Sequence, residues 1–213
     1  MMPVIGARTS FHIVVLCLLS TLAAVLTAGC GTPQASATPV PIPPTFIRHT
    51  DTAAGVSVSY PPDWVTDIES FQASVESRNE ILRGEGYYVH PGISELLFGA
   101  GRRTEGGYSP SLTIFVDAFP GLVTPQQYIG LARDDIVEGV KWISDSEVQN
   151  GKTEAVMAVY EYPDNGGPAR NYMLVATRGR VALVFNCTVY APFTETEQQE
   201  CLTVVRSAEI FSP

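Results

Sequence analysis

Apolar and polar residues alternate along much of this chain, which is the pattern of β-strands with one buried face. The alternation begins in the segment 56–60, VSVSY, where serines separate the apolar side chains. Pro61 and Pro62 end this segment, because neither residue can donate a hydrogen bond to a neighbouring strand. The preceding segment 46–55 is the expected partner strand, with the turn between the two at Gly55.

The second half of the chain carries the longest strand patterns. We predict four strands there, over residues 140–149, 152–162, 169–177 and 181–190. Asn150-Gly151 joins the first two and is a strong signal for a tight hairpin turn. The central strands are apolar at both odd and even positions, so that Met157 and Val156 lie on opposite faces. A strand with two apolar faces is covered on both. The pattern therefore predicts an α+β fold, an antiparallel β-sheet covered by helices on both faces (an α-β-α sandwich).

Two helices are expected to supply that cover. Thr124 is a good N-cap and Gln127 stands at the capping-box position, so the first helix is predicted to begin there and to end at Gly139. The second is predicted to begin near Thr194, with Glu197 three residues later. Apolar residues recur at helical spacing along both segments, which gives each helix one face toward the sheet.

The region 70–110 is rich in glycine and polar residues, and two segments in it, 84–92 and 99–111, are predicted to be loops ahead of a strand over 111–119. Loops carry binding functions more often than scaffold does. Aromatic and arginine side chains are favoured at binding hot spots. The candidate binding residues are therefore Tyr87, Tyr88 and His90 in the first loop and Arg102, Arg103 and Tyr108 in the second. The alternative is that these segments are flexible loops with solvated arginines.

The N-terminal segment 1–29 has the layout of an export signal. Arg8 precedes a mainly apolar run over 11–25, and three small residues lead to Cys30. This is the order of a secretory signal peptide. The apolar run, the small residues and the cysteine together resemble a bacterial lipobox. That resemblance implies that a diacylglycerol is attached to the thiol of Cys30 and that a peptidase cleaves before it. The alternative is an uncleaved transmembrane helix, which needs about 20 apolar residues.

Residues 30–45 form the expected tether. After Cys30 the segment consists mainly of Pro, Ala, Thr and Ser and has no charge. Pro-rich chains stay extended at about 3.1 Å per residue, so this one can hold a domain roughly 45 Å from a membrane. A disordered leader with no length requirement is the other interpretation. The folded domain is then predicted over residues 46–213.

The formal net charge of −9 limits the partners of the protein. An acidic surface is unsuited to nucleic acid and to electrostatic docking on anionic lipid. The expected partners are the membrane, reached through the lipid on Cys30, and another envelope protein or a small ligand. The expected location is outside the cytoplasm, anchored to the cell membrane or the cell surface.

The four cysteines also fit export. Cys17 leaves with the signal peptide and Cys30 takes the lipid, which leaves Cys187 and Cys201 in the folded domain. Cys187 shares its strand face with apolar residues, and Cys201 lies on the apolar face of the last helix. A disulfide between the two is geometrically reasonable in an oxidising compartment. Two buried free thiols are the alternative.

Candidate catalytic chemistry is sparse. The mature chain has two histidines, His49 and His90, and neither stands in a metal-binding or nucleophile motif. No metal or other cofactor is therefore expected, and no residue is assigned as catalytic. The main hypothesis is a non-catalytic accessory or binding module. The alternative is an envelope hydrolase that uses His90 or His49 in a site assembled from distant positions.

The order of elements resembles the PsbP-like fold: a hairpin that ends in YPPDW, a strand, a helix, a meander of four strands and a closing helix. The residues that carry the likeness are Gly55, Val58, Tyr60, Pro61 and Trp64 at the start and Val205, Ser207 and Phe211 at the end. The family includes extrinsic photosystem II subunits and bacterial lipoproteins of the LpqN type. The resemblance implies an α-β-α sandwich that works as a binding or accessory module, without shared catalytic residues.

Overall fold

A computed structural model describes most of the expected domain. The described residues are 41–73, 76, 95–134, 139–150, 153–164 and 166–211. The predicted lipidation site, Cys30, lies outside them. So do three of the candidate binding residues: Tyr87, Tyr88 and His90.

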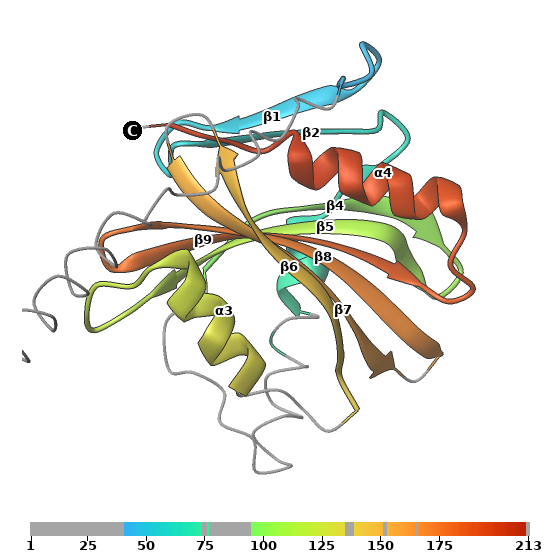
Figure 1. Ribbon diagram of the computed structural model, residues 1–213. Coiled ribbons are helices and arrows are strands. Elements are labelled where there is room, and N and C mark those ends of the chain that lie inside the picture. The colour runs from blue at the N-terminus through green and yellow to red at the C-terminus, as the bar shows by residue number, and fades with distance from the viewer. Residues whose placement is uncertain are drawn as a thin grey trace, which may run out of the picture. The chain divides into compact units, whose positions relative to one another are not determined.

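The centre of the domain is a seven-stranded antiparallel sheet (Figure 1). Its strands are β3 (Val65–Thr66), β4 (Glu95–Thr104), β5 (Gly107–Ala118), β6 (Lys141–Asn150), β7 (Thr153–Asp164), β8 (Gly167–Arg178) and β9 (Val181–Tyr190). Their order across the sheet is β3-β4-β5-β9-β8-β7-β6. Strands β6 to β9 form the predicted meander, and β5 joins it by pairing with β9.

A second, three-stranded sheet brings the two ends of the domain together. Its strands are β1 (Ile47–Asp51), β2 (Val56–Tyr60) and β10 (Glu209–Ile210), and β2 lies in the middle. The predicted turn at Gly55 is confirmed. Gly55 has a φ of +66°, in the left-handed region that favours glycine. The predicted hairpin therefore forms, and its second strand pairs with the C-terminal strand.

One face of the large sheet packs against α4 (Glu195–Arg206) and the three-stranded sheet (Figure 1). Val58 of β2, Val204 of α4 and Phe185 of β9 are completely buried in this layer. They belong to one continuous apolar core. This core joins elements from both ends of the domain, so the ends are held by burial as well as by strand pairing.

The opposite face carries α3 (Pro125–Asp134), which packs on β7 and β8 (Figure 1). Ile129 of α3 is buried against Val156 and Met173. The predicted α+β fold with antiparallel sheets is therefore confirmed. The predicted helical cover of both faces is confirmed only in part, because α3 packs mainly on two of the seven strands.

Both helices begin where the capping signals placed them. In α3 the N–H of Gln127 donates to Oγ1 of Thr124 at 3.2 Å, and the N–H of Thr124 donates back to Oε1 of Gln127 at 2.9 Å. In α4 the N–H of Glu197 donates to Oγ1 of Thr194 at 3.2 Å. Each cap satisfies N–H groups that the helix itself leaves free.

The predicted disulfide is present. Cys187 of β9 and Cys201 of α4 are bonded, with 5.4 Å between their Cα atoms. Both residues are completely buried in the layer between the large sheet and α4. The bond therefore fixes the closing helix to the middle of the sheet, as the matching faces of strand and helix predicted.

The prediction that 99–111 is a loop is wrong. The segment belongs to β4 and β5, which form a hairpin that turns at residues 105–106. A Cβ atom at Gly99 would lie 2.4 Å from the ring of Phe71, and one at Gly101 would lie 2.8 Å from Cβ of Tyr108. Glycine inside a strand marks such a close approach of another group. The glycines of this segment therefore serve close packing.

Candidate functional site

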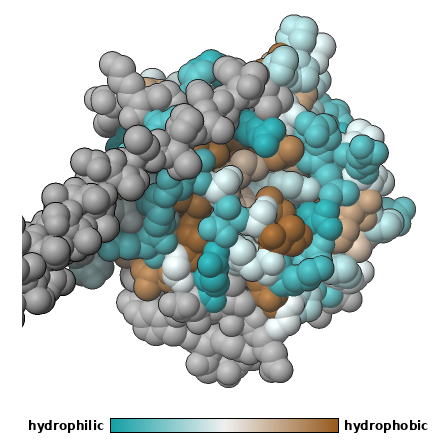
Figure 2. Space-filling model, in the orientation of Figure 1, coloured by the Kyte–Doolittle hydropathy of each residue, from teal (hydrophilic) through white to brown (hydrophobic). Residues whose placement is uncertain are grey.

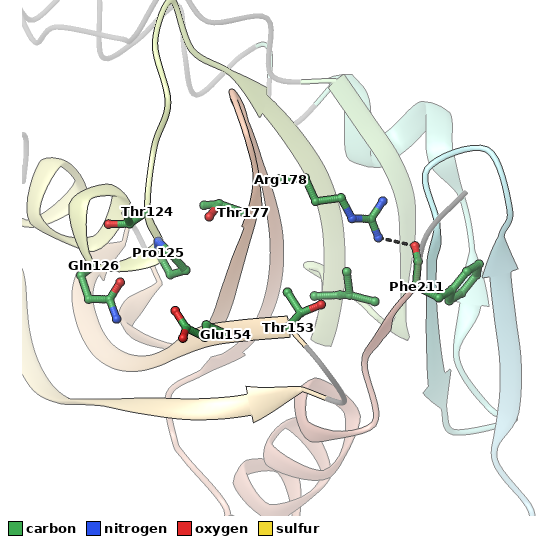
Figure 3. Close-up of a pocket in the computed structure, with 9 residues that line it drawn as sticks. Thr124, Pro125, Gln126, Thr153, Glu154, Thr177, Arg178 and Phe211 are labelled. Carbon is green, nitrogen blue, oxygen red and sulfur yellow. Dashed lines mark hydrogen bonds between the residues drawn. The ribbon is translucent and has the colours of Figure 1, made fainter. Parts of the chain in front are cut away.

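A pocket of about 730 Å³ lies where α3, the large sheet and the C-terminal segment meet (Figure 3). This volume is within the usual range of small-molecule sites, about 300–1,000 Å³. The residues that line it are Thr124, Pro125, Gln126, Thr153, Glu154, Thr177, Arg178, Ile210 and Phe211. They come from the first turn of α3, the start of β7, the end of β8 and the C-terminal end of the domain.

Arg178 connects the large sheet to the β1–β2 turn and to the C-terminal side of this pocket. Its Nη1 donates to the carbonyl oxygen of Ala54 at 2.9 Å, and its Nη2 donates to those of Gly55 at 2.7 Å and Phe211 at 2.5 Å. The N–H of Phe211 also donates to the carbonyl oxygen of Gly55 at 2.9 Å. One side chain of the large sheet thus fixes the β1–β2 turn and the C-terminal segment, and Figure 3 shows its contact with Phe211.

Among the described residues, no carboxylate forms an ion pair with Arg178. Burial among backbone groups lowers the pKa of its guanidinium, because desolvation disfavours the charged form. Carbonyl dipoles are its hydrogen-bond partners, so its charge is solvated by the backbone rather than neutralised.

Glu154 supplies the opposite charge at another part of the pocket. In Figure 3 its carboxylate and the side chain of Gln126 lie away from the guanidinium of Arg178. Glu154 is exposed and forms no salt bridge with any described residue. The pocket therefore holds one acid and one base that do not neutralise each other.

Hydroxyl and amide groups complete the polar lining. Thr153 and Thr177 are half-buried, and neither side chain has a hydrogen-bond partner in the described structure. The amide nitrogen of Gln126 donates to Oε1 of Glu147 at 2.9 Å, which leaves its carbonyl oxygen for a ligand. Pro125 and Ile210 are buried and give the pocket an apolar part. This set can bind a polar ligand by hydrogen bonds and by contact.

The described lining of the pocket contains few of the residue types that act as catalytic bases or nucleophiles. Its described lining contains no histidine and no cysteine, and its single carboxylate is that of Glu154. A hydrolytic site needs a nucleophile or an activated water within reach of a base. In the described lining, the groups of these types are the threonine hydroxyls and the carboxylate of Glu154.

The described candidate binding residues lie on the β4–β5 hairpin and not at the pocket. Arg102 was expected in a flexible loop, but it is on β4 and its Nε contacts Asp63 at 2.8 Å. Its Nη2 contacts the Glu200 carboxylate of α4 at 2.9 Å. These ion pairs tie the hairpin to α4 and to the segment after β2. Arg102 therefore has a structural role in the described domain.

Arg103 and Tyr108 face each other across the same hairpin. Nη2 of Arg103 donates to the phenol oxygen of Tyr108 at 3.5 Å, and that hydroxyl donates to the Asp67 carboxylate at 2.8 Å. The N–H of Ser70 and the Tyr108 hydroxyl lower the pKa of Asp67, since both stabilise its charged form. The structure thus brings together Arg103 and Tyr108 in one small polar cluster.

His49 of β1 lies in an apolar setting. Its ring stacks on that of Phe98 with 4.0 Å between centroids, and its Nε2 is buried without a hydrogen-bond partner in the described chain. Burial lowers the pKa of the imidazole, and the negative charge of Asp51 opposes that shift. A catalytic histidine needs a partner that orients it. The described surroundings of His49 provide none.

Two further properties of the described residues concern membranes and metals. No helix among them is both long and apolar enough to cross a membrane. They also contain no cluster of three or more His, Cys, Asp or Glu side chains placed to share a metal ion. On the face that Figure 2 shows, the described surface carries apolar residues in small groups separated by polar ones.

The sequence indicated separate parts of the pocket but not the pocket itself. The capping signal at Thr124 and the turn at Gly55 were both recognised, whereas Arg178 at the end of β8 was not singled out. These parts are distant in sequence and meet through strand pairing. Only the assembled fold therefore shows that they share a site.

Comparison with solved structures identifies proteins of the same fold. One is CyanoP, the cyanobacterial PsbP of Synechocystis sp. PCC 6803, which is 13% identical, covers 84% of this chain and 100% of its own, and gives a TM-score of 0.51. Another is LpqN of Mycobacterium tuberculosis, described as involved in cell envelope biogenesis. It is also 13% identical, covers 85% of this chain and 100% of its own, and gives a TM-score of 0.51. The domain therefore has a PsbP-like fold, as its order of elements predicted.

The sequence comparisons add nothing to this assignment. The chain matches no protein-family model, and the comparison with curated proteins gives no match. At 13% identity, the two structural likenesses establish the fold and no residue-level function.

Proposed function

We propose that this protein is an exported, lipid-anchored binding module of the cell envelope, which holds a ligand in the pocket around Arg178 without transforming it. In this proposal residues 1–29 are the signal peptide and residues 30–45 are the lipidated cysteine and its tether. Residues 46–213 are the binding domain, an α-β-α sandwich of the PsbP type.

The observation that carries the binding role is the composition of the pocket. Its lining offers hydroxyl, amide, carboxylate and guanidinium groups in a volume of about 730 Å³, and none of these groups is a histidine or cysteine. The hydrolase alternative required a histidine paired with an acid or a nucleophile. His49 stacks on Phe98 instead and is not among the residues of the pocket. His90, the other histidine of that alternative, lies outside the described residues.

Three observations support the envelope setting. The lipobox-like sequence ends at Cys30, an uncharged Pro-rich segment follows it, and the domain contains a disulfide. Disulfides persist in oxidising compartments outside the cytoplasm. LpqN, which shares the fold, is described as involved in cell envelope biogenesis, and we extend that setting to this chain as part of the proposal.

The anchor is tested by changing Cys30 to Ser in the full chain and fractionating the cells. The wild-type protein should be found in the membrane fraction, processed and carrying a lipid detectable by mass spectrometry. The variant should remain unprocessed and carry no lipid. If the wild-type chain itself carries no lipid on Cys30, the anchor proposal fails and an uncleaved transmembrane segment becomes the better interpretation.

The binding role is tested with a photo-crosslinking amino acid in place of Gln126, at the pocket, in intact cells. The matched control places the same amino acid at Glu105, in the exposed turn between β4 and β5. Covalent adducts at position 126 that are absent at position 105 support the proposal. They should also disappear when Thr177 is changed to Trp, which fills the pocket. Identical adducts at both positions, or no adduct at 126, would contradict it.

A further inference from the structure

The hydrogen-bonding groups that the pocket leaves unused indicate which ligand it takes. This inference rests on the proposed binding function and names the ligand class for the same site. Three of the five N–H donors of Arg178, one at Nη1 and both at Nη2, are already bound to carbonyl oxygens. Oγ1 of Thr124 accepts the N–H of Gln127, so the first turn of α3 is capped by its own residues. Most of the charged donors in the pocket are therefore occupied.

The unused groups are mainly acceptors. They are the carboxylate of Glu154, the carbonyl oxygen of Gln126, and the hydroxyls of Thr153 and Thr177, which both donate and accept. The two remaining N–H groups of Arg178 are the unused charged donors. An anionic ligand would meet the exposed carboxylate and find three of the five guanidinium N–H groups taken. Phosphate and carboxylate ligands are therefore disfavoured on both grounds.

The charges of the pocket also disfavour a strongly cationic ligand. Arg178 keeps its positive charge beside the same cavity and has no carboxylate partner among the described residues. One acid and one base of opposite sign leave the lining with no net formal charge. An uncharged ligand suits such a lining, because it places no like charge beside either Glu154 or Arg178.

The apolar part of the lining matches the same class of ligand. Ile210 and Pro125 are buried and Phe211 is half-buried at the edge of the cavity. Sugar rings present C–H groups on their faces and hydroxyl groups around their rims. The C–H faces fit apolar side chains, and the hydroxyls fit carboxylate, amide and threonine partners. We propose that the pocket binds an uncharged, hydroxyl-rich ligand, namely a neutral saccharide.

The proposal is tested by saturation-transfer NMR on the full chain purified from membranes in detergent. The probes are three neutral disaccharides with different ring chemistry: N,N′-diacetylchitobiose, α-1,6-mannobiose and α-1,5-arabinobiose. Spermidine and glycerol 3-phosphate are the cationic and anionic comparison probes. We expect transfer to at least one disaccharide and none to the two charged probes.

Two substitutions locate the binding in the pocket. Thr177→Val keeps the shape of the side chain but removes its hydroxyl, and Glu154→Ala removes the carboxylate. Each should weaken the affinity for the bound disaccharide about tenfold, the effect of losing a hydrogen bond worth about 1.4 kcal/mol. The control is Thr104→Val at an exposed strand position outside the pocket. Its affinity should match that of the wild type.

Several results would overturn the ligand class. They are binding of none of the disaccharides, stronger binding of spermidine or glycerol 3-phosphate, or saccharide binding that neither pocket substitution weakens. The crosslinking test of the binding role is independent of these outcomes. If pocket-specific adducts form at position 126 while the disaccharides fail to bind, the ligand class is wrong and the binding role stands.

Discussion

The hydrogen bonds from Arg178 to the carbonyl oxygens of Ala54, Gly55 and Phe211 form a latch between the large sheet and the two ends of the domain. Replacing Gly55 with Ala tests whether this latch stabilises the fold. Gly55 is buried in the β1–β2 turn with a φ of +66°. A Cβ atom there would lie 2.3 Å from the carbonyl oxygen of Phe211 and 2.8 Å from Nη1 of Arg178. The first of these atoms is backbone, so the C-terminal segment must move to accommodate the methyl group.

The expected cost has two parts. A non-glycine residue in the left-handed region costs about 1–2 kcal/mol. Displacing the C-terminal segment breaks the contact between Arg178 and the Phe211 carbonyl, and a hydrogen bond to a charged group is worth about 1.5–3 kcal/mol. Alanine also restricts the unfolded chain, which returns about 0.4–1 kcal/mol. The free energy of unfolding of Gly55→Ala should therefore fall by about 2–4 kcal/mol, a large fraction of the stability of a small domain.

Two other glycines separate these contributions. Gly179 has a φ of +62° and nothing within 4 Å of its added Cβ, so Gly179→Ala should show the backbone cost alone. Gly106 has neither a positive φ nor a neighbour within 4 Å, so Gly106→Ala should be neutral or slightly stabilising. The measurement is urea unfolding followed by tryptophan fluorescence, with the midpoint and slope compared among the three variants. If Gly55→Ala is no less stable than Gly179→Ala, the latch contributes nothing and the reasoning is refuted.

Two further predictions concern the disulfide and pH. The bond between Cys187 and Cys201, 14 residues apart in sequence, closes a loop of about 15 residues, which the chain-entropy estimate values at about 3 kcal/mol. The free energy of unfolding in urea should therefore fall by at least that amount when both cysteines are changed to Ala. Equal stability of the two chains would contradict this. The pKa of His49 is lowered in the folded state by burial, so the unfolded chain binds the proton more readily, and the wild-type free energy of unfolding should fall as pH drops below about 6.5. His49→Phe, which keeps a ring against Phe98, should lose that part of the pH dependence, and identical pH profiles for the two chains would argue against the buried imidazole.

The elements that could be predicted from the sequence are those set by residues close together in the chain. The caps at Thr124 and Thr194 each depend on a partner three residues later, so both helix starts were confirmed. The meander strands follow from alternation and from short turns. The disulfide could also be predicted, since strand and helix periodicity placed Cys187 and Cys201 on facing sides.

The same local reasoning failed over the segment 99–111. Glycine signals a loop in most sequences, but in β4 it makes room for side chains that approach from elsewhere. Phe71 fills the space over Gly99, and it comes from a segment 28 positions earlier in the chain. The arginines of the segment were therefore expected on a loop, as binding residues or as solvated groups, whereas Arg102 lies on a strand and bridges to Asp63 and Glu200.

The candidate site was hidden from the sequence for a different reason. Arg178 binds the carbonyl oxygens of Ala54, Gly55 and Phe211, and every residue has a carbonyl group, so no residue type reveals these partners. The contacts form because β10 pairs with β2 and brings the C-terminal segment beside the β1–β2 turn, at the end of β8. A site built from backbone partners across such non-local pairings leaves one trace in sequence, a glycine at the point of closest approach. Gly55 is that residue, and only the folded structure shows that it makes room for the Phe211 carbonyl and the Arg178 side chain.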